Sequence, residues 1–261
     1  MEYTLPETSL IQIKTLEKVN DRGTFVIEPL SPGYGVTVGN SLRRVLLSSL
    51  EGAAITSCKI EGASHQFSNL PGIKEDIVEI ILNLRTLRFL FNSDEPVILK
   101  LKAKGPKLVT AEDFETSSAC EIVNKSVHLA TLGKTGKLNL EIVVAKGRGY
   151  VPVEKRKDEK LPIGTIAVDS IFTPVKKVHY EIENTRVGAE TDFDKLTMEV
   201  TTDGSIDPEI ALGRAAKILV EHFGLVDQAC REVIPAKAEK AAPKAKKIKK
   251  AVKKTVKKVK K

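Results

Sequence analysis

Apolar and polar residues alternate through the first thirty positions of the chain, a pattern typical of strands. Ile13 lies before a polar turn, Asn20-Asp21-Arg22-Gly23, and Phe25 and Ile27 follow the turn at alternating positions. The pattern over residues 10–30 therefore predicts two strands joined by that turn.

The next stretch, GVTVGNSLRRVLLSSLEG at residues 35–52, predicts an amphipathic helix that ends at Gly52 in a left-handed stop. At about 100° per residue, one wide arc of this helix is purely apolar. Its members are Val38, Leu42, Val45, Leu46 and Leu50. The other arc mixes polar and apolar side chains, namely Asn40, Arg43, Arg44 and Leu47. Two arcs of such different composition predict two different neighbours.

The middle of the chain is rich in strand patterns. Residues 53–62, 96–105 and 137–150 each combine alternation with β-branched residues. One helix interrupts them in IKEDIVEIILNLRTL, where apolar residues recur at helical spacing. These residues are Ile77, Ile80, Ile81 and Leu84.

The last third predicts a hairpin followed by a helix. Residues 178–182 and 196–200 alternate as two strands, and the segment between them is expected to be the hairpin loop. Asp207-Pro208 is an N-cap followed by proline at the first helical position, and it begins a helix that runs to about Glu232. Apolar residues share one side of this helix: Leu212, Ala215, Ala216, Leu219, Phe223 and Val226. Two amphipathic helices on a small sheet leave apolar surface that a homodimer could bury.

Composition indicates a soluble globular protein. The 261 residues are 41% hydrophobic and 29% charged, without an apolar run of membrane-spanning length, and the first residues do not resemble a signal peptide. The three cysteines, Cys58, Cys120 and Cys230, lie far apart. We therefore expect a reducing cytoplasm, no disulfide framework and no zinc site.

The positive charge is concentrated at the end of the chain. From Pro235 onward there are thirteen lysines and one glutamate, a net charge of +12, so the other residues carry −4 of the total of +8. The repeated lysines of this segment oppose a helix in water, and we expect a disordered basic tail.

Candidate catalytic or metal-binding residues are few. The four histidines are scattered, and neither a dinucleotide fingerprint nor a phosphate-binding loop is present. Lys146-Gly-Arg-Gly-Tyr150 is explained equally well as an anion site and as a strand ending in a glycine turn. Asp192 and Asp194, two positions apart, could chelate Mg²⁺ for phosphoryl transfer, although a solvated loop is the favoured interpretation. We expect no catalytic residue and no metal ligand in this chain.

The arginines of the first helix have two explanations. Arg43 and Arg44 could face water, but Leu47 between them would then also be exposed. Arginine combines an aliphatic stem with a forked donor, so this composition favours a protein interface.

Six segments in order resemble the α subunit of bacterial DNA-directed RNA polymerase. They are VGNSLRRVLLSSLEGAAITSCKIEG, EDIVEIILNL, GRGYVPVEK, LPIGTIAVDSIFTPVKKVHYEIENTRV, TDFDKLTMEV and GSIDPEIALGRAA. The resemblance covers residues 1–234 and implies an α+β fold. A dimerisation domain, an antiparallel sheet with two long helices, is expected from residues 1–51 and 175–234. A strand-rich domain is inserted at 52–174, and the basic tail is 235–261.

The resemblance also implies partners. Two copies are expected to pair through Val38, Leu42, Val45, Leu46, Leu50, Leu212, Leu219 and Phe223. The pair would carry the large β and β′ subunits, and through the complete enzyme ω and sigma, by Arg43, Arg44, Leu47, Glu79, Arg85, Val168 and Asp169. Arg85 stands where many members carry lysine. Catalysis and its Mg²⁺ are expected in the large partners, with no cofactor bound by this chain.

The basic tail is where the sequence departs from the family. Most members continue into a compact helical domain that binds DNA, whereas this sequence has only lysine-rich residues there. Lys246, Lys247, Lys249, Lys250, Lys253 and Lys254 could contact DNA phosphates without sequence preference. The alternative function is a stand-alone nucleic-acid-binding protein that acts through this tail, and the tail could also have no role at promoters.

Overall fold

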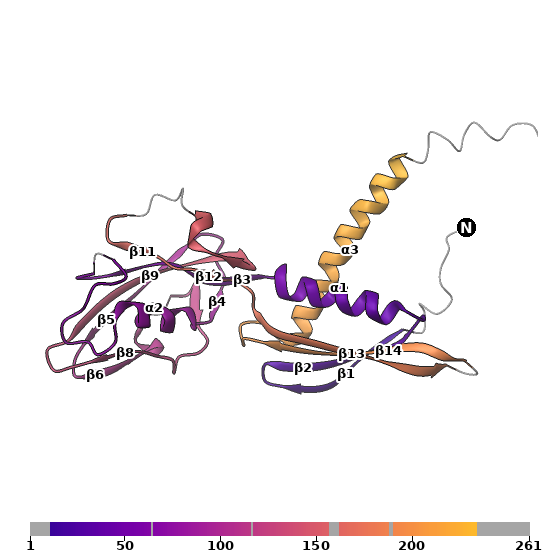
Figure 1. The fold of residues 1–261 in the computed structure, drawn as a ribbon, viewed down its shortest axis with the longest axis horizontal. Helices are drawn as coiled ribbons and strands as arrows, with labels where there is room; N and C mark the ends of the chain where they lie inside the picture. Colours follow the sequence, from indigo (N-terminus) through magenta and orange to yellow (C-terminus); the bar gives the residue numbers. More distant parts are fainter. Residues whose placement is uncertain (1–10, 64, 116, 157–161, 188–189, 234–261) are drawn as a thin grey trace, which may run out of the picture. The chain divides into compact units, whose positions relative to one another are not determined.

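The computed structural model describes residues 11–63, 65–115, 117–156, 162–187 and 190–233. The described residues fall into two compact units that divide after Ala216. The α+β class expected from the sequence is confirmed, since several small sheets are combined with three α-helices in the described part of the chain (Figure 1).

The first sheet joins the two ends of the chain. Its strands lie in the order β1 (Gln12–Val19), β2 (Arg22–Leu30), β14 (Glu190–Thr202) and β13 (Val175–Val187), and all neighbours are antiparallel. The predicted first hairpin is confirmed, with a tighter turn. Asn20 and Asp21 alone connect β1 to β2, because Asn20 adopts a φ of 47° that asparagine tolerates.

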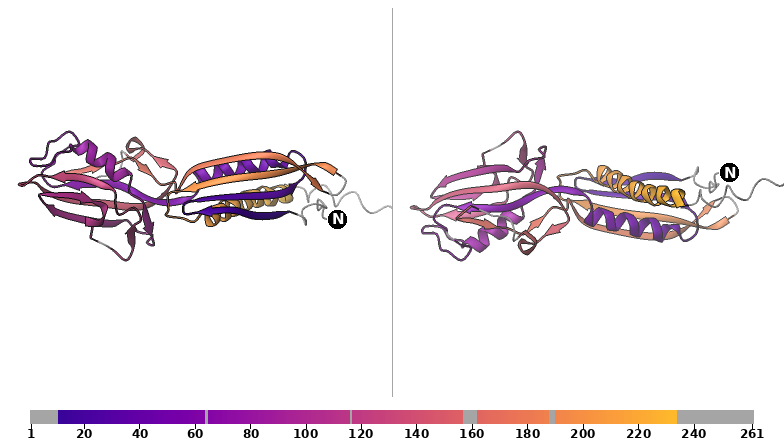
Figure 2. Two further views of the ribbon diagram at one scale, coloured as in Figure 1. Left: turned by 90° about the horizontal axis from the view of Figure 1, so that it is seen from below. Right: turned by 90° about the horizontal axis from the view of Figure 1, so that it is seen from above.

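The two faces of this sheet differ in chemistry. On one face Phe25, Leu196 and Met198 are buried, and α1 (Tyr34–Ser48) lies on this face against β13 and β14. A Cβ on Gly39 of α1 would lie 2.9 Å from the ring of Tyr180, so glycine lets the helix lie directly on the strands. The other face carries ion pairs such as Arg22–Glu199 at 2.8 Å. A sheet with one apolar and one charged face is typical of antiparallel strands that cover a core from one side. Figure 2 shows α1 lying along one side of these strands.

Helix α1 is shorter than the sequence predicted. It ends at Ser48, and Gly52 lies inside the next strand, β3 (Glu51–Ile60), so the prediction of a left-handed stop at Gly52 is wrong. The structure gives Gly52 a different role. A Cβ at this position would lie 1.9 Å from the carbonyl oxygen of Phe172, so only glycine permits this close approach of two backbones.

The predicted hairpin loop between residues 182 and 196 is also wrong. Both β13 and β14 are 13 residues long, and they pair as far as Val187 and Glu190. The extension is rich in polar residues, which hid its strand character. Phe193, which is buried, is the apolar residue that fixes it to the core.

The second main sheet has the order β11 (Thr165–Ala167), β3, β9 (Lys137–Arg148) and β5 (Val97–Lys104), again antiparallel throughout. It confirms the three strands predicted in the middle of the chain. Smaller pairs accompany it: β4 (Phe89–Phe91) with β7 (Cys120–Ile122), β6 (Lys107–Thr110) with β8 (His128–Leu132), and β10 (Tyr150–Val151) with β12 (Ser170–Ile171). Two 3₁₀ turns, Ala111–Asp113 and Val153–Arg156, complete the described elements of this region.

Helix α2 (Ile77–Arg85) supplies the core of this region. Asp76 caps it by accepting a hydrogen bond of 2.7 Å from the backbone N–H of Glu79. Ile77, Ile80 and Leu84 are fully buried, in one continuous apolar core with residues of β3, β5 and β9. The helical spacing read from the sequence is therefore confirmed.

Helix α3 (Pro208–Val233) begins where the sequence predicted. The carboxylate of Asp207 accepts a hydrogen bond of 3.1 Å from the N–H of Glu209. In the first unit Ala211 and Ala215 are fully buried. None of the helices in the described ranges has both the length and the apolarity needed to cross a bilayer.

Candidate functional site

The exposed face of α1 is a narrow stripe of mixed residues. Val36, Asn40, Arg43 and Leu47 follow one another at spacings of four, three and four, so they lie above one another on the helix. Val36 and both arginines are exposed, and Leu47 is half-buried. Arg44 flanks the stripe. Val36 was not among the residues predicted for this face, although its position in the helical repeat was visible.

The opposite face of α1 is buried within the single chain. Leu42 and Leu46 are 6% and 0% exposed, and Val38 and Val45 at its edge are half-buried. Leu50 is also buried, but it lies beyond the helix, in the connection to β3. The predicted division of α1 into a buried apolar arc and an exposed arginine-bearing arc is thus seen in the structure.

Neither Arg43 nor Arg44 forms an ion pair with a carboxylate of the described residues. Their guanidinium groups are exposed on a regular helix beside apolar side chains. A guanidinium group carries five N–H donors in a rigid fork and remains charged at any physiological pH. The stripe can therefore bind carboxylates or carbonyl groups of a partner while Val36 and Leu47 supply apolar contact.

A second exposed surface lies on α2. Glu79 is exposed, and Leu82, one turn further on, is 52% exposed although it is apolar. Arg85 follows, and its Nη1 lies 3.9 Å from Oδ2 of Asp169. Asp169 is held in place by the N–H of Val153, which donates to its Oδ1 at 2.9 Å. The fold thus brings together Arg85 and Asp169, which the resemblance had named separately.

Leu82 is a residue of this second surface that sequence reasoning missed. The signal was present, because Leu82 lies outside the helical repeat of Ile77, Ile80 and Leu84 that forms the core. An apolar residue on the polar side of a helix indicates a contact surface.

Val168 does not share this exposure. Its side chain is 2% exposed and belongs to the core, two positions after the buried Ile166. Its carbonyl oxygen accepts a hydrogen bond from the guanidinium of Arg156, which also donates to the carbonyl of Thr56 at 3.1 Å. Within this chain, Val168 is placed to support Asp169 rather than to present its own side chain.

The predicted pairing residues of α3 fall into different environments. Leu212 is buried in the first unit, Leu219 is half-buried, and Phe223 is 63% exposed. Val220, Leu225 and Val226 of the second unit are also exposed by 60% or more. Apolar side chains of this size gathered on one short helical stretch indicate a surface that another chain covers.

One of the two aspartates of the candidate metal site already makes a structural hydrogen bond. Asp194 is 8% exposed, and its Oδ2 accepts a hydrogen bond of 2.9 Å from the N–H of Gly35. Asp192 is exposed. In the described ranges, no group of three or more histidine, cysteine or acidic residues is arranged to hold a metal ion. The expectation of a solvated loop at these aspartates is corrected, since both lie in β14.

The second candidate, the Lys146–Tyr150 segment, is strand rather than anion site. Lys146 pairs with Asp94 at 2.7 Å, and Arg148 pairs with Glu51. Both cations already have acidic partners. A glycine turn with positive φ at Gly149 follows the strand, as the second interpretation of the sequence predicted.

His128 contacts a buried carboxylate and has a structural role. Its Nε2 lies 3.0 Å from Oε1 of the buried Glu75, which also accepts hydrogen bonds from the N–H and hydroxyl of Thr131 at 2.6 and 2.8 Å. Burial alone would raise the pKa of Glu75, but these donors outweigh it and lower the pKa to about 2. The cluster ties the segment before α2 to strand β8.

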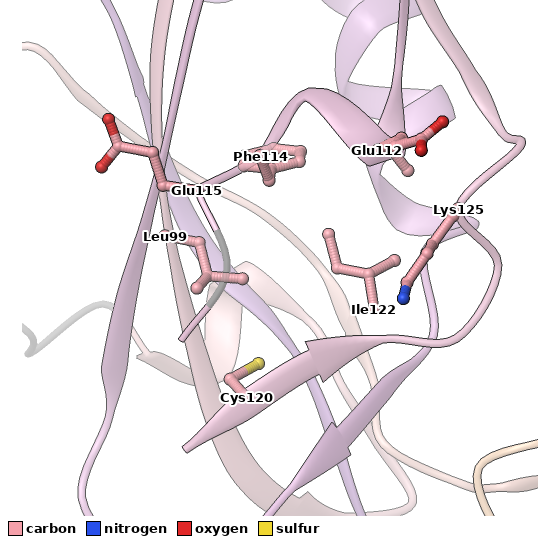
Figure 3. A pocket seen from close by; sticks show the side chains of 8 residues that line it. Leu99, Glu112, Phe114, Glu115, Cys120, Ile122 and Lys125 are labelled. Atoms are coloured by element: carbon pink, nitrogen blue, oxygen red, sulfur yellow. The ribbon is translucent and has the colours of Figure 1, made fainter. Parts of the chain in front are cut away.

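A pocket of about 180 Å³ in the second sheet region is mainly apolar (Figure 3). Leu99, Phe114 and Ile122 line it, Cys120 lies at its floor, and Lys125 stands at one side. Burial raises the pKa of the Cys120 thiol to about 11, so the sulfur is protonated at neutral pH and is a poor nucleophile. Glu112 and Glu115 also line the pocket, but in the described part of the chain neither carboxylate is hydrogen-bonded to the thiol.

A scan against protein families identifies the class of the central region. Residues 58–173 match the family model described as the RNA polymerase Rpb3/RpoA insert domain. These residues include α2, most of the second main sheet and the surface formed by Glu79, Leu82, Arg85 and Asp169.

Curated relatives extend the match over most of the chain. A protein of Symbiobacterium thermophilum named DNA-directed RNA polymerase subunit alpha is 54% identical over 219 residues, which is 84% of this chain and 70% of the relative. Its namesake in Moorella thermoacetica is 52% identical over 84% of this chain and 71% of its own length. The one in Alkaliphilus oremlandii is 50% identical over 86% and 70%. The chain belongs to the family of bacterial DNA-directed RNA polymerase α subunits.

Proposed function

We propose that this chain is the assembly subunit of a bacterial DNA-directed RNA polymerase. Two copies pair, and the pair carries the large subunits β and β′, which perform DNA-templated RNA synthesis. The observation that carries the proposal is the two-faced helix α1, whose apolar arc is buried while its arginine-bearing stripe is exposed. The identity of 54% to a relative named DNA-directed RNA polymerase subunit alpha supports the proposal.

Pairing of two copies is supported by apolar side chains that the single chain leaves exposed. In the first unit Ile13 and Leu16 of β1 are 64% and 65% exposed. In the second unit Phe223 and Val226 are 63% and 60% exposed. Each buried apolar side chain of this size contributes about 1.5–3 kcal/mol. In the proposed dimer the two copies cover these residues and the half-buried edge of α1, Val38 and Val45.

Capture of the large subunits is assigned to the two exposed mixed surfaces. The stripe of α1 offers Arg43, Arg44 and Leu47, and the surface of α2 offers Glu79, Leu82 and Arg85. Both combine charged side chains with a leucine, half-buried Leu47 on α1 and exposed Leu82 on α2, the composition of an interface centre surrounded by polar contacts. In this proposal, residues 1–51 and 175–234 pair the copies while residues 52–174 contribute the second capture surface.

The chemistry is assigned to the large partners. This chain contributes no catalytic residue in the proposal, and the Mg²⁺ that assists nucleotidyl transfer is bound elsewhere in the enzyme. The assembly works in the bacterial cytoplasm together with ω and sigma. The lysines at 246, 247, 249, 250, 253 and 254, which lie outside the described residues, add sequence-independent contacts to DNA phosphates.

Stepwise reconstitution tests the proposal. The purified chain is mixed first with purified β and then with β′ of the same organism, and each mixture is separated by size-exclusion chromatography with light scattering. We expect the chain alone to have twice its mass of 28.5 kDa and to bind β and β′. A chain that binds DNA but remains monomeric and binds neither subunit would favour the stand-alone nucleic-acid-binding alternative.

A further inference from the structure

The outward face of the second main sheet carries an unusual concentration of lysines. Strand β5 presents Lys100, Lys102 and Lys104 at alternating positions, while Leu99, Leu101 and Ala103 between them are buried in the core. Lys137 of β9 is exposed on the same face, since it pairs with Lys104. Lys59 of β3 is exposed there too, because it pairs with Glu141, which is also the cross-strand partner of Lys100. We call these five lysines the lysine face.

Only part of this charge is neutralised within the chain. Glu141 pairs with Lys100 at 3.0 Å, and Glu61 accepts a hydrogen bond from Asn139 rather than from a lysine. Among the residues that the structure describes, Lys102, Lys104 and Lys137 have no carboxylate within ion-pair distance. Five lysines and two glutamates leave this face with a net charge of +3.

The arrangement of Lys104 and Lys137 is itself unfavourable. The two residues are direct cross-strand partners, and like charges in that position destabilise a sheet. Strand geometry also sets a regular spacing, because alternate residues of β5 lie about 6.7 Å apart at about 3.3–3.4 Å per residue. A ladder of cations at fixed spacing that the chain does not neutralise is complementary to a regular polyanion.

The chemistry of the face decides which polyanion. The hollow between the strands, about 260 Å³, is lined by Lys59, Lys100 and Lys102 together with Asn139 and acidic or aliphatic side chains, and none of the described residues lining it is aromatic. Single-stranded nucleic acids are bound largely by stacking on aromatic rings. Protein partners are anchored mainly by tryptophan, tyrosine and arginine, whereas β5 presents lysines and one exposed aliphatic residue, Ile98, on this face. Contacts to the phosphates of a duplex need only regularly placed cations.

We propose that the lysine face of the inserted region is a binding surface for the phosphate backbone of double-stranded DNA. Lys102, Lys104 and Lys137 contact phosphates of one duplex, and Lys59 and Lys100 flank them. The contacts are independent of base sequence, because no side chain of the face reaches into a groove as a helix or an arm would. The inference does not depend on pairing or on the capture of β and β′.

Lysine footprinting tests this on the full chain with a fluorescein-labelled 30-base-pair duplex as the probe. Mass spectrometry follows the acetylation rate of each lysine, so the tail lysines are read separately. We expect the duplex to slow acetylation of Lys102, Lys104 and Lys137 at least fivefold and to leave Lys14 and Lys125, which are already paired with glutamates, unchanged. Unchanged rates at all three residues would overturn the proposal.

The salt dependence of duplex binding provides a second test of the proposal. Replacing Lys102, Lys104 and Lys137 together by glutamine should reduce the slope of log K against log salt by about 3, since each phosphate contact contributes about 0.9. A control that replaces Lys14, Lys125 and Lys195 by glutamine makes the same change in net charge and should keep the slope. An equal reduction of the slope in both triple variants would contradict the proposal. Slower acetylation of the lysine face in the presence of a polyglutamate peptide, but not of the duplex, would also contradict it.

Discussion

The carboxylate of Asp194 on β14 accepts a hydrogen bond of 2.9 Å from the backbone N–H of Gly35 in the first turn of α1. The residue that precedes the helix, Gly33, offers no side chain to cap it. The first N–H groups of a helix need acceptors, and a negative charge near them is favourable. A residue 159 positions away in the sequence thus supplies the cap that local sequence lacks.

Replacing Asp194 by alanine should therefore lower the free energy of unfolding by about 1–3 kcal/mol, because a buried N–H loses a charged acceptor. Urea unfolding followed by circular dichroism measures the change. Asp192→Ala is the matched control, since Asp192 is exposed on the same strand, and it should change the stability by less than about 0.5 kcal/mol. Equal losses in the two variants would show that the contact with Gly35 has no special weight.

Two glycine substitutions test the close approach of the β3 backbone to the carbonyl of Phe172. Gly52→Ala places a Cβ 1.9 Å from the carbonyl oxygen of Phe172 and should destabilise the chain by about 1–3 kcal/mol or prevent folding. Gly213→Ala, in α3, meets no atom within 4 Å and should stabilise it by about 0.5–1 kcal/mol. Thermal unfolding of the two variants and the unchanged chain measures these differences. A Gly52→Ala variant as stable as the unchanged chain would refute the steric explanation.

The cluster around Glu75 predicts an acid-sensitive stability. The folded-state pKa of Glu75 is lowered from 4.5 to about 2, so the folded state binds its proton less readily than the unfolded chain does. The contribution to stability is therefore complete above pH 4.5 and is lost as the pH falls towards 2. Its full size is about 3 kcal/mol.

Urea titrations between pH 7 and pH 2 measure this contribution. Glu75→Gln should be less stable than the unchanged chain at pH 7, and the difference should shrink below pH 4.5. Glu95→Gln is the control, because Glu95 is exposed and its side chain has no partner shown among the described residues. A constant difference at every pH would mean that the charge of Glu75 is not the stabilising feature.

Two substitutions on α1 separate its faces. Arg44→Ala removes an exposed cation and should leave the dimer intact while weakening the capture of a large subunit at least tenfold, about 1.4 kcal/mol or more. Arg44→Lys keeps the charge but not the forked donor, and should recover only part of the binding. Leu46→Asp places an unpaired charge at a fully buried position and should prevent folding or pairing. Light scattering gives the pairing and a β pull-down gives the capture.

The sequence was informative where burial repeats with a fixed period. The two faces of α1, the buried stripe of α2 and the alternation of β14 were all visible, because Leu46, Ile80 and Met198 obey simple helical or strand spacing. The N-caps of α2 and α3 were equally local, and the second was predicted from Asp207-Pro208.

Relationships between distant residues could not be read in this way. The end of α1 was misplaced because Gly52 is required by the carbonyl of Phe172, which is 120 positions further on. Asp194 suggested a metal ligand because its real partner, Gly35, belongs to a distant helix. The resemblance named Val168 together with Asp169, but the sequence could not show that the side chain of Val168 is only 2% exposed, since neighbouring positions of an extended segment point to opposite sides. The domain limits and the pairing and capture surfaces remain predictions.

Native mass spectrometry of the tagged chain, purified from its own cell under gentle conditions, tests the central proposal most directly. We expect one assembly that contains two copies of the chain with one β and one β′. A single copy of 28.5 kDa, with neither a second copy nor a polymerase subunit bound, would contradict it.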